Sequence, residues 1–418
     1  MLRIKIRLLF FIGIVLIPAA FIFSQNIFLP EINKEAEKYV SQKNNKGIVI
    51  GIINGDETAV QGFGVKSDLE KERPDENTIF EVGSITNVFT TSLMLLESYQ
   101  GKFSLGERVQ SHAPPGVQIP TYQHMVCTEY FIPDIMDSDA YRIVSCQPDP
   151  TVPDICIGFC DLASHSSGLP SEPKGIFRNK FFRKIFYKKD PYKNYTKRDL
   201  YNDLPKYTIN CPPGVHFDYS NVGMALLGNI MADMNNISYG DLLQNAILSP
   251  LEMENTGVGL SRTQLQFLAK GHNKKGKAVK HWSFKGMAPA GGVKSSAGDL
   301  VKFLQVNMGL AGKQIIMDAF AQTHEPQLDH PSYVLNKKTY TGYGWFTSEL
   351  NPTTKAVWVS GSTGGFRSFI GFVKSSNVGI VVLSNSAEDV EAMGFEMLEL
   401  LNEEAGKEEP VLLGGGGK

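Results

Sequence analysis

Residues 47–63 have the sequence GIVIGIINGDETAVQGF, and this stretch is the best guide to the fold. It contains two apolar runs on either side of Asn54-Gly55-Asp56, a pattern typical of a β-hairpin with a tight turn. A second hairpin is predicted near the other end of the chain. There, residues 366–373 and 378–384 are rich in β-forming side chains around Ser375-Ser376-Asn377. We therefore expect strands at both ends of the chain.

The middle of the chain has helical patterns instead. Apolar side chains recur at helical spacing in residues 85–99, 222–234 and 299–308, and again in residues 388–402. The predicted fold class is α/β, more narrowly α+β. An antiparallel sheet is built from both chain ends and flanked by helices, with a mainly helical subdomain inserted over about residues 84–308.

Composition and charge limit the possible classes of protein. The chain has 418 residues, of which 42% are hydrophobic and 20% charged, which excludes a disordered chain, a collagen and a coiled-coil rod. The formal net charge of −2 gives no reason to expect a nucleic-acid partner. A mean hydropathy of −0.14 excludes a polytopic membrane protein. We expect one main domain over residues 30–405 and a flexible tail over 406–418.

The N-terminus resembles a targeting segment. Arg3, Lys5 and Arg7 precede an uncharged, mostly apolar run over residues 8–23. Residues 1–24 are therefore interpreted as a cleaved signal peptide or as an N-terminal membrane anchor. The run is short for a membrane span, which needs about 20 residues. Both interpretations predict an exported protein, periplasmic or extracellular, that is held at the membrane in the second case.

Four of the five cysteines lie in one Pro-rich insertion over about residues 118–160: Cys127, Cys146, Cys156 and Cys160. In an exported protein, clustered cysteines predict disulfides, and four cysteines allow three pairings. A zinc site is a weaker interpretation, because the spacing is irregular and no histidine pair accompanies it. We predict no metal and no cofactor.

Three short segments contain residues suited to nucleophilic chemistry. In residues 81–90 (EVGSITNVFT), Ser84 precedes an apolar helix, as either a helix cap or a nucleophile at a helix N-terminus. In residues 211–221 (CPPGVHFDYSN), Tyr219 and Asn221 follow a turn and precede a helix. In residues 359–367 (VSGSTGGFR), small residues let a strand approach another backbone closely.

Taken together and in this order, the segments resemble the class C branch of the serine β-lactamase and penicillin-binding-protein superfamily. That branch includes D-alanyl-D-alanine carboxypeptidases and related esterases. The resemblance covers roughly residues 35–400. It also includes residues 164–170 (SHSSGLP) and 291–300 (GGVKSSAGDL), which look like two further motifs of the family. It implies a β-lactamase/transpeptidase-like fold.

The resemblance also implies a role for each matched residue. Ser84 would be the nucleophile that forms an acyl-enzyme, and Tyr219 the general base. The backbone N–H groups of Ser84 and Ser362 would form the oxyanion hole. Asn221 would hold the substrate amide. The remaining substrate-binding positions by resemblance are Asn87, Gly361 and Thr363.

Two departures from the family pattern concern its lysines. Asn87 stands where the Ser-x-x-Lys motif has lysine, and Val359 stands at the lysine of Lys-Thr-Gly. A tyrosine with a pKa near about 10 needs nearby positive charge to act as a base at neutral pH. Arg367 and Lys294 are candidate replacement cations.

Two hypotheses follow from these departures. In the first, the protein is an exported serine hydrolase acting on an ester, amide or D-Ala-type peptide, and it is impaired towards β-lactams. In the second, it is a pseudoenzyme that binds an envelope peptide or protein. The expected partner is a small-molecule or peptide substrate, derived from the cell wall in one interpretation.

Two surface features complete the predictions. The segment from Lys174 to Arg198 interleaves basic and aromatic residues. It is either a solvated loop or a contact with an anionic membrane surface or wall polymer. The insertion over residues 118–160 is a candidate lid over the cleft.

Overall fold

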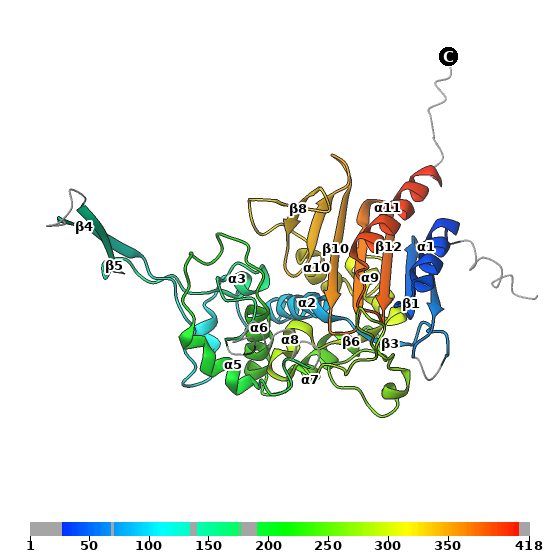
Figure 1. Ribbon diagram of the computed structural model, residues 1–418, viewed down its shortest axis with the longest axis horizontal. Coiled ribbons are helices and arrows are strands. Elements are labelled where there is room, and N and C mark those ends of the chain that lie inside the picture. The colour runs from blue at the N-terminus through cyan, green and yellow to red at the C-terminus, as the bar shows by residue number, and fades with distance from the viewer. Residues whose placement is uncertain (1–26, 68–70, 134–139, 175, 177–189, 409–418) are drawn as a thin grey trace, which may run out of the picture.

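The computed structural model describes residues 27–67, 71–133, 140–174, 176 and 190–408 (Figure 1). Its centre is an eight-stranded antiparallel sheet with the order β2-β1-β12-β11-β10-β9-β8-β7. The strands of this sheet are β1 (Gly47–Asn54), β2 (Glu57–Gly64), β7 (Ser332–Val334), β8 (Lys337–Thr341), β9 (Phe346–Glu349), β10 (Lys355–Ser362), β11 (Arg367–Val373) and β12 (Val378–Ser384). Two smaller sheets pair β3 (Ile79–Glu81) with β6 (Lys294–Ser296), and β4 (Met125–Pro133) with β5 (Ala140–Pro148).

Both predicted hairpins are confirmed, as β1–β2 and β11–β12. The two hairpins join directly, because β1 pairs antiparallel with β12 from Ile48 opposite Ser384 to Asn54 opposite Val378. Strands from the two ends of the chain therefore pair side by side within the sheet. The helical region is inserted between them in the sequence. This architecture confirms the predicted fold class.

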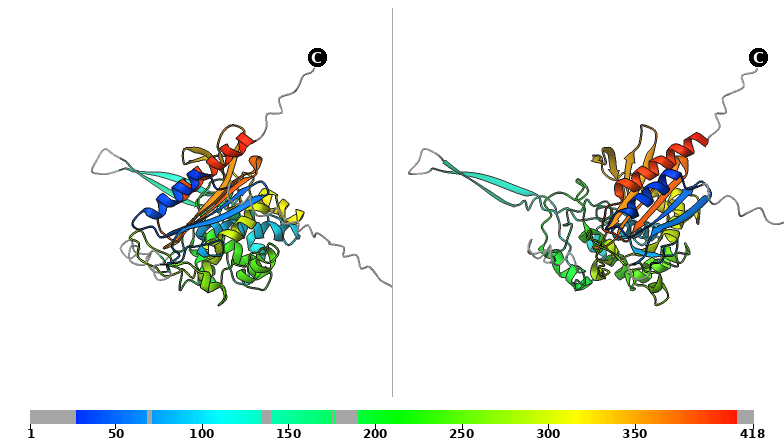
Figure 2. Two further views of the ribbon diagram at one scale, coloured as in Figure 1. Left: turned by 90° about the vertical axis from the view of Figure 1, so that its right-hand side faces the viewer. Right: turned by 45° about the vertical axis from the view of Figure 1, so that its right-hand side comes forward.

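Helices cover both faces of the sheet (Figures 1 and 2). On one face lie α1 (Pro30–Ser41) and α11 (Glu391–Glu408), which bury apolar side chains such as Ile32 and Leu398 against the strands. On the other face, α9 (Ala297–Met308) packs on β1, β11 and β12. The predicted terminal helix thus begins three residues later than expected and continues to Glu408, into the segment interpreted as a tail.

The helical region centres on α2 (Thr86–Tyr99) and α6 (Asn221–Met234), within one residue of the predicted bounds. Nearly every side chain of α2 is buried, so α2 is the central helix of this region. The other α-helices among the described residues are α3 (Phe159–Ala163), α5 (Lys197–Asp203), α7 (Tyr239–Leu243), α8 (Ala288–Gly291) and α10 (Gln314–Gln322). The close contact of α6 with α8 requires Gly228, where a Cβ would lie 2.3 Å from Pro289 Cβ.

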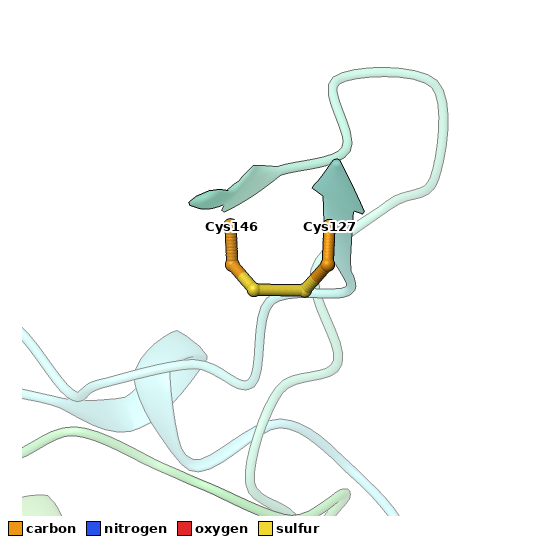
Figure 3. Close-up of a disulfide and its surroundings, with 2 residues drawn as sticks. All are labelled: Cys127 and Cys146. Atoms are coloured by element: carbon orange, nitrogen blue, oxygen red, sulfur yellow. A yellow bond between two sulfur atoms is a disulfide. The ribbon is translucent and has the colours of Figure 1, made fainter. Parts of the chain in front are cut away.

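Strands β4 and β5 form a hairpin that projects from the body of the molecule (Figures 1 and 2). A disulfide joins Cys127 to Cys146 across the two strands, where the residues are directly paired (Figure 3). The prediction of a disulfide within the cysteine cluster is thereby confirmed. The cysteines outside this disulfide are Cys156, Cys160 and Cys211, and their thiols are free.

Several predictions concern residues that the structure does not describe. The interpreted signal peptide or anchor, residues 1–24, lies outside the described residues, and so does most of the segment from Lys174 to Arg198. In the described part of the chain, no helix combines the length and apolar character needed to cross a bilayer.

Candidate active site

Ser84 lies in a short 3₁₀ turn, Gly83–Ile85, that leads from β3 into α2. Two glycines bring the end of β10 against this turn. Gly83 has φ 53°, and a Cβ there would lie 2.6 Å from the backbone N of Ser362. A Cβ on Gly361 would lie 2.0 Å from the Val82 carbonyl oxygen and 3.0 Å from the Ser84 nitrogen. The backbones of Ser84 and Ser362 are adjacent because neither glycine has a side chain.

Tyr219 reaches Ser84 from a distant part of the sequence. Its Oη donates to Ser84 Oγ at 2.8 Å, although 135 residues separate the two. The next residue, Ser220, fixes the start of α6, because its Oγ accepts from the Gly223 backbone N–H at 2.8 Å. The N–H of Ser220 in turn donates to His165 Nδ1 at 3.1 Å. Tyr219 is thus held by a capped helix end and by the buried ring of His165.

His165 is a neutral support for this tyrosine. The two rings lie 4.4 Å apart, and burial lowers the pKa of His165 to about 3. A neutral imidazole has a free acceptor nitrogen, as the hydrogen bond from Ser220 requires. His165 therefore supplies no positive charge beside Tyr219 at neutral pH.

Asn87 completes a chain of three side chains. It lies about one helical turn beyond Ser84, and its Nδ2 donates to Tyr219 Oη at 3.0 Å. Asn87 is 1% exposed, and its Oδ1 has no hydrogen-bond partner among the described residues. Donation therefore runs from Asn87 to Tyr219 and from Tyr219 to Ser84. Ser84 is the acceptor in this arrangement, the reverse of what proton removal from the serine requires.

The environment keeps the phenol of Tyr219 protonated. Burial raises its pKa above the ordinary value, and the carboxylate of Glu172 acts in the same direction. The hydrogen bonds with Ser84 and Asn87 lower the pKa, but they do not outweigh burial. Two neutral partners cannot stabilise a phenolate as a neighbouring cation would.

A cavity of about 360 Å³ opens beside this hydroxyl pair. Of the seven residues predicted for the site, five line it: Ser84, Asn87, Tyr219, Gly361 and Ser362. Asn221 and Thr363 are not among the lining residues. Asn221 Nδ2 donates to Glu172 Oε1 at 3.0 Å, and the buried Thr363 Oγ1 has no partner in the described chain. The structure therefore brings most, but not all, of the predicted residues together at the cavity.

The two candidate replacement cations differ in position. Arg367 lines the cavity, and its Nη1 donates to the backbone carbonyls of Thr363 and Phe366 at 2.9 and 2.8 Å. Lys294 lies on β6 opposite Glu81 and is not among the lining residues. Burial lowers the pKa of Lys294, while Glu81 and Asp190 act against that shift. Val359 lines the cavity and is 3% exposed.

Some residues at the site were missed by the sequence analysis. Glu172 accepts from Tyr192 Oη at 2.7 Å as well as from Asn221, and burial raises its pKa. Its position two residues after the SHSSGLP segment was the available signal. Asp389 and Glu391, at the start of α11, also line the cavity. Nothing in their local sequence distinguishes them from ordinary residues at a helix N-terminus.

The described part of the insertion over residues 118–160 does not form the lid that was predicted. None of the described residues of this insertion lines the cavity, and the β4–β5 hairpin projects from the body (Figure 2). In the described part of the chain, no three His, Cys, Asp or Glu side chains form a group that could hold a metal ion.

The fold and the Ser84–Tyr219 pair define a protein of the serine β-lactamase and penicillin-binding-protein class. A family model described as Beta-lactamase matches residues 32–399, and the chain belongs to this family. It is 22% identical over 386 residues to a β-lactamase of Providencia stuartii, covering 85% of this chain and 86% of the relative. It is 21% identical over 348 residues to the D-alanyl-D-alanine-carboxypeptidase/endopeptidase AmpH of Escherichia coli (strain K12). The match covers 81% of this chain and 78% of the relative.

Solved structures share the fold. A β-lactamase/D-alanine carboxypeptidase from Yersinia pestis, complexed with citrate, has a TM-score of 0.68 at 21% identity, covering 89% of this chain and 97% of the other. A class C β-lactamase from Rhodobacter sphaeroides has a TM-score of 0.69 at 20% identity. The match covers 89% of this chain and 98% of the other.

Proposed function

We propose that the protein is a slow serine hydrolase that forms an acyl-enzyme on Ser84 from an ester, an amide or a D-Ala-type peptide. The observation that carries this proposal is the 2.8 Å contact between Ser84 Oγ and Tyr219 Oη at the edge of the cavity. Paired hydroxyls at hydrogen-bond distance are the geometry that a nucleophile and its base require.

The reaction follows from these positions. Ser84 Oγ attacks the carbonyl carbon of the substrate, and the carbonyl electron pair moves to oxygen. The adjacent backbone N–H groups of Ser84 and Ser362 stabilise this oxyanion. The Tyr219 phenolate takes the Ser84 proton and passes it to the leaving group as the carbon–leaving-group bond breaks. Water then hydrolyses the acyl-enzyme by the same route, which regenerates Ser84.

The rate is limited by how rarely Tyr219 is a phenolate. Its pKa is raised, and its partners Ser84 and Asn87 are neutral. Each unit by which the pKa exceeds pH 7 lowers the phenolate fraction about tenfold. We therefore propose poor turnover of β-lactams, although relatives of this chain are β-lactamases.

A second candidate function is binding without catalysis. The neutral Asn87 and Val359 at the family's lysine positions favour it, because they leave the cavity in place while weakening the base. In this case, the cavity would hold an envelope peptide or a protein segment.

We also propose that the protein is exported. The basic, apolar segment over residues 1–24 supports it, as does the Cys127–Cys146 disulfide, since disulfides persist mainly in oxidising compartments. We further propose a cell-wall peptide as the substrate, and contact of the segment from Lys174 to Arg198 with an anionic membrane surface.

A fluorophosphonate probe, which reacts with activated serines, separates hydrolysis from binding. We expect slow labelling of the wild-type protein that Ser84→Ala abolishes. Because the base is the phenolate of a tyrosine with a raised pKa, the labelling rate should keep rising from pH 7 to at least about pH 10. Tyr219→Phe should remove this rise. A folded wild-type protein that stays unlabelled across the range would favour the binding function.

A further inference from the structure

Four side-chain rings follow one another from the reactive tyrosine to β9, and together they form a ring row: Tyr219, His165, Phe217 and Phe346. The rings of Tyr219 and His165 lie 4.4 Å apart. Phe217 meets His165 edge to face, with 5.9 Å between the ring centroids, and it meets Phe346 in the same way at 6.1 Å. Tyr219, His165 and Phe346 line the cavity, and Phe217 joins the last two. A ligand held at Ser84 can therefore extend over aromatic surface.

Part of the ring row is open to solvent beside the cavity. Phe217 is 40% exposed, and Val215 on the same loop is 47% exposed. Phe346 is half-buried and is the first residue of β9. Phe217 comes from the helical region and Phe346 from the sheet, so the two sides of the cleft meet in their contact. Exposed apolar surface next to a cavity is typical of a ligand-binding site.

The ring row carries no charge at neutral pH. Burial lowers the pKa of His165 to about 3 and raises the pKa of Tyr219 above its ordinary value. The cavity wall at Val359 is apolar as well, at the position where the family has a lysine. The charged residues that line the cavity belong to other segments, namely Lys274, Arg367, Asp389 and Glu391. The row is therefore suited to a neutral, apolar part of a ligand.

We propose that the substrate of this site carries an aromatic ring on its acyl group, and that this ring packs against Phe217 and Phe346. The inference rests on the proposed function and adds the substrate class. Ring–ring contacts contribute roughly two- to tenfold in affinity beyond the burial of apolar area, which favours an aromatic ring over an alkyl group. The rings of Tyr219 and Phe217 are two contacts apart in the row. A short linker therefore separates the ring of the substrate from its reacting carbonyl.

Three boronic acids test this proposal. Boron accepts an electron pair from the serine oxygen, the serine proton leaves to solvent, and no leaving group can occupy the ring row. The probes are phenylacetamidomethylboronic, cyclohexylacetamidomethylboronic and acetamidomethylboronic acid, with dissociation constants measured by calorimetry. The phenyl probe should bind about tenfold more tightly than the acetamido probe and at least about twofold more tightly than the cyclohexyl probe. Because cyclohexane is the more hydrophobic ring, the second preference reports ring–ring contact. Ser84→Ala should weaken all three.

The matched variants are Phe217→Ala and Phe267→Ala. Both remove a phenyl ring of similar exposure, 40% and 37%, but Phe267 neither lines the cavity nor belongs to the ring row. Phe217→Ala should reduce the preference for the phenyl over the acetamido probe to less than about threefold, whereas Phe267→Ala should retain it.

Three results would each overturn the aromatic site alone. They are equal binding of the phenyl and acetamido probes by the wild-type protein, a cyclohexyl probe that binds as tightly as the phenyl probe, and a full phenyl preference in Phe217→Ala. Failure of all three probes to bind the folded wild-type protein overturns the aromatic site together with the serine nucleophile.

Discussion

The cleft and the β4–β5 hairpin are built in opposite ways. Residues from β10, α2, the loop before α6 and the start of α11 meet at the cavity, from positions as far apart in sequence as Ser84 and Glu391. The hairpin is one continuous segment held by its own strand pairing and by Cys127–Cys146. A change in the cleft is therefore transmitted through packed neighbours, whereas a change in the hairpin stays local.

The largest expected effect comes from Asn87→Lys. An ammonium beside Tyr219 Oη would favour the phenolate, so hydrolysis of p-nitrophenyl acetate should rise about a hundredfold, the low end for general-base help. Combining Val359→Lys with Asn87→Lys should raise the rate further, but by less than the product of the two separate effects. Both cations act on one proton transfer.

Asn87→Met is the control, because methionine is similar in length to lysine but carries no charge. The rate of p-nitrophenyl acetate hydrolysis should not rise in this variant. Ser84→Ala in the Asn87→Lys background should abolish the gain. If Asn87→Met raised the hydrolysis rate as much as Asn87→Lys, then packing, and not charge, would limit the reactivity of Ser84. Brisk wild-type turnover that depends on Ser84 would show that another group already supplies the base.

A smaller effect is expected from Gly83→Ala. The new Cβ would collide with Ser362 N, and φ 53° is unfavourable for alanine. Fluorophosphonate labelling of Ser84 should fall at least about tenfold, because a displacement of about 1 Å is costly in catalysis. Gly101→Ala is the matched control, since its φ is 75° but nothing lies within 4 Å of the new Cβ.

In this pair, Gly101→Ala should lose about 1–2 kcal/mol in the free energy of unfolding, measured with urea, and Gly83→Ala should lose more, because its Cβ also meets the Ser362 backbone. Only Gly83→Ala should lose labelling. Equal labelling in the two variants would mean that the approach of β10 to the Ser84 turn has no role in reactivity.

The smallest effect is expected from the double variant Cys127→Ser/Cys146→Ser. A two-stranded hairpin without further packing is marginal on its own, so its amides should exchange faster with solvent. The free energy of unfolding of the body should change by less than about 1 kcal/mol. A loss of several kcal/mol, or slower labelling of Ser84, would show that the hairpin and the cleft are coupled.

Local patterns were sufficient to predict the sheet hairpins and the helices α2, α6 and α9. Their apolar periodicity and turn residues are properties of short segments. The contact of Ser84 with Tyr219 was predictable only because the segments around both residues matched one family in order. The spacing of 135 residues carries no information by itself.

Other parts of the site depend on tertiary contacts that no local pattern encodes. The orphan Oδ1 of Asn87, the carboxylate of Glu172 behind Asn221 and the presence of Glu391 at the cavity are of this kind. The lid interpretation failed for a related reason. Cysteine clustering predicts a bridge, but it does not say in which direction the bridged segment extends.

The pairing of β1 with β12 has a consequence for how the chain acquires its structure. Val378–Ser384 is synthesised more than 300 residues after its partner Gly47–Asn54. The centre of the sheet therefore cannot form until β12 has been synthesised, and the apolar side chains of β1 lack their partner strand until then. Such non-local pairing slows folding and prolongs the exposure of aggregation-prone strands. A truncation before β12 should yield insoluble protein, however complete its helical region.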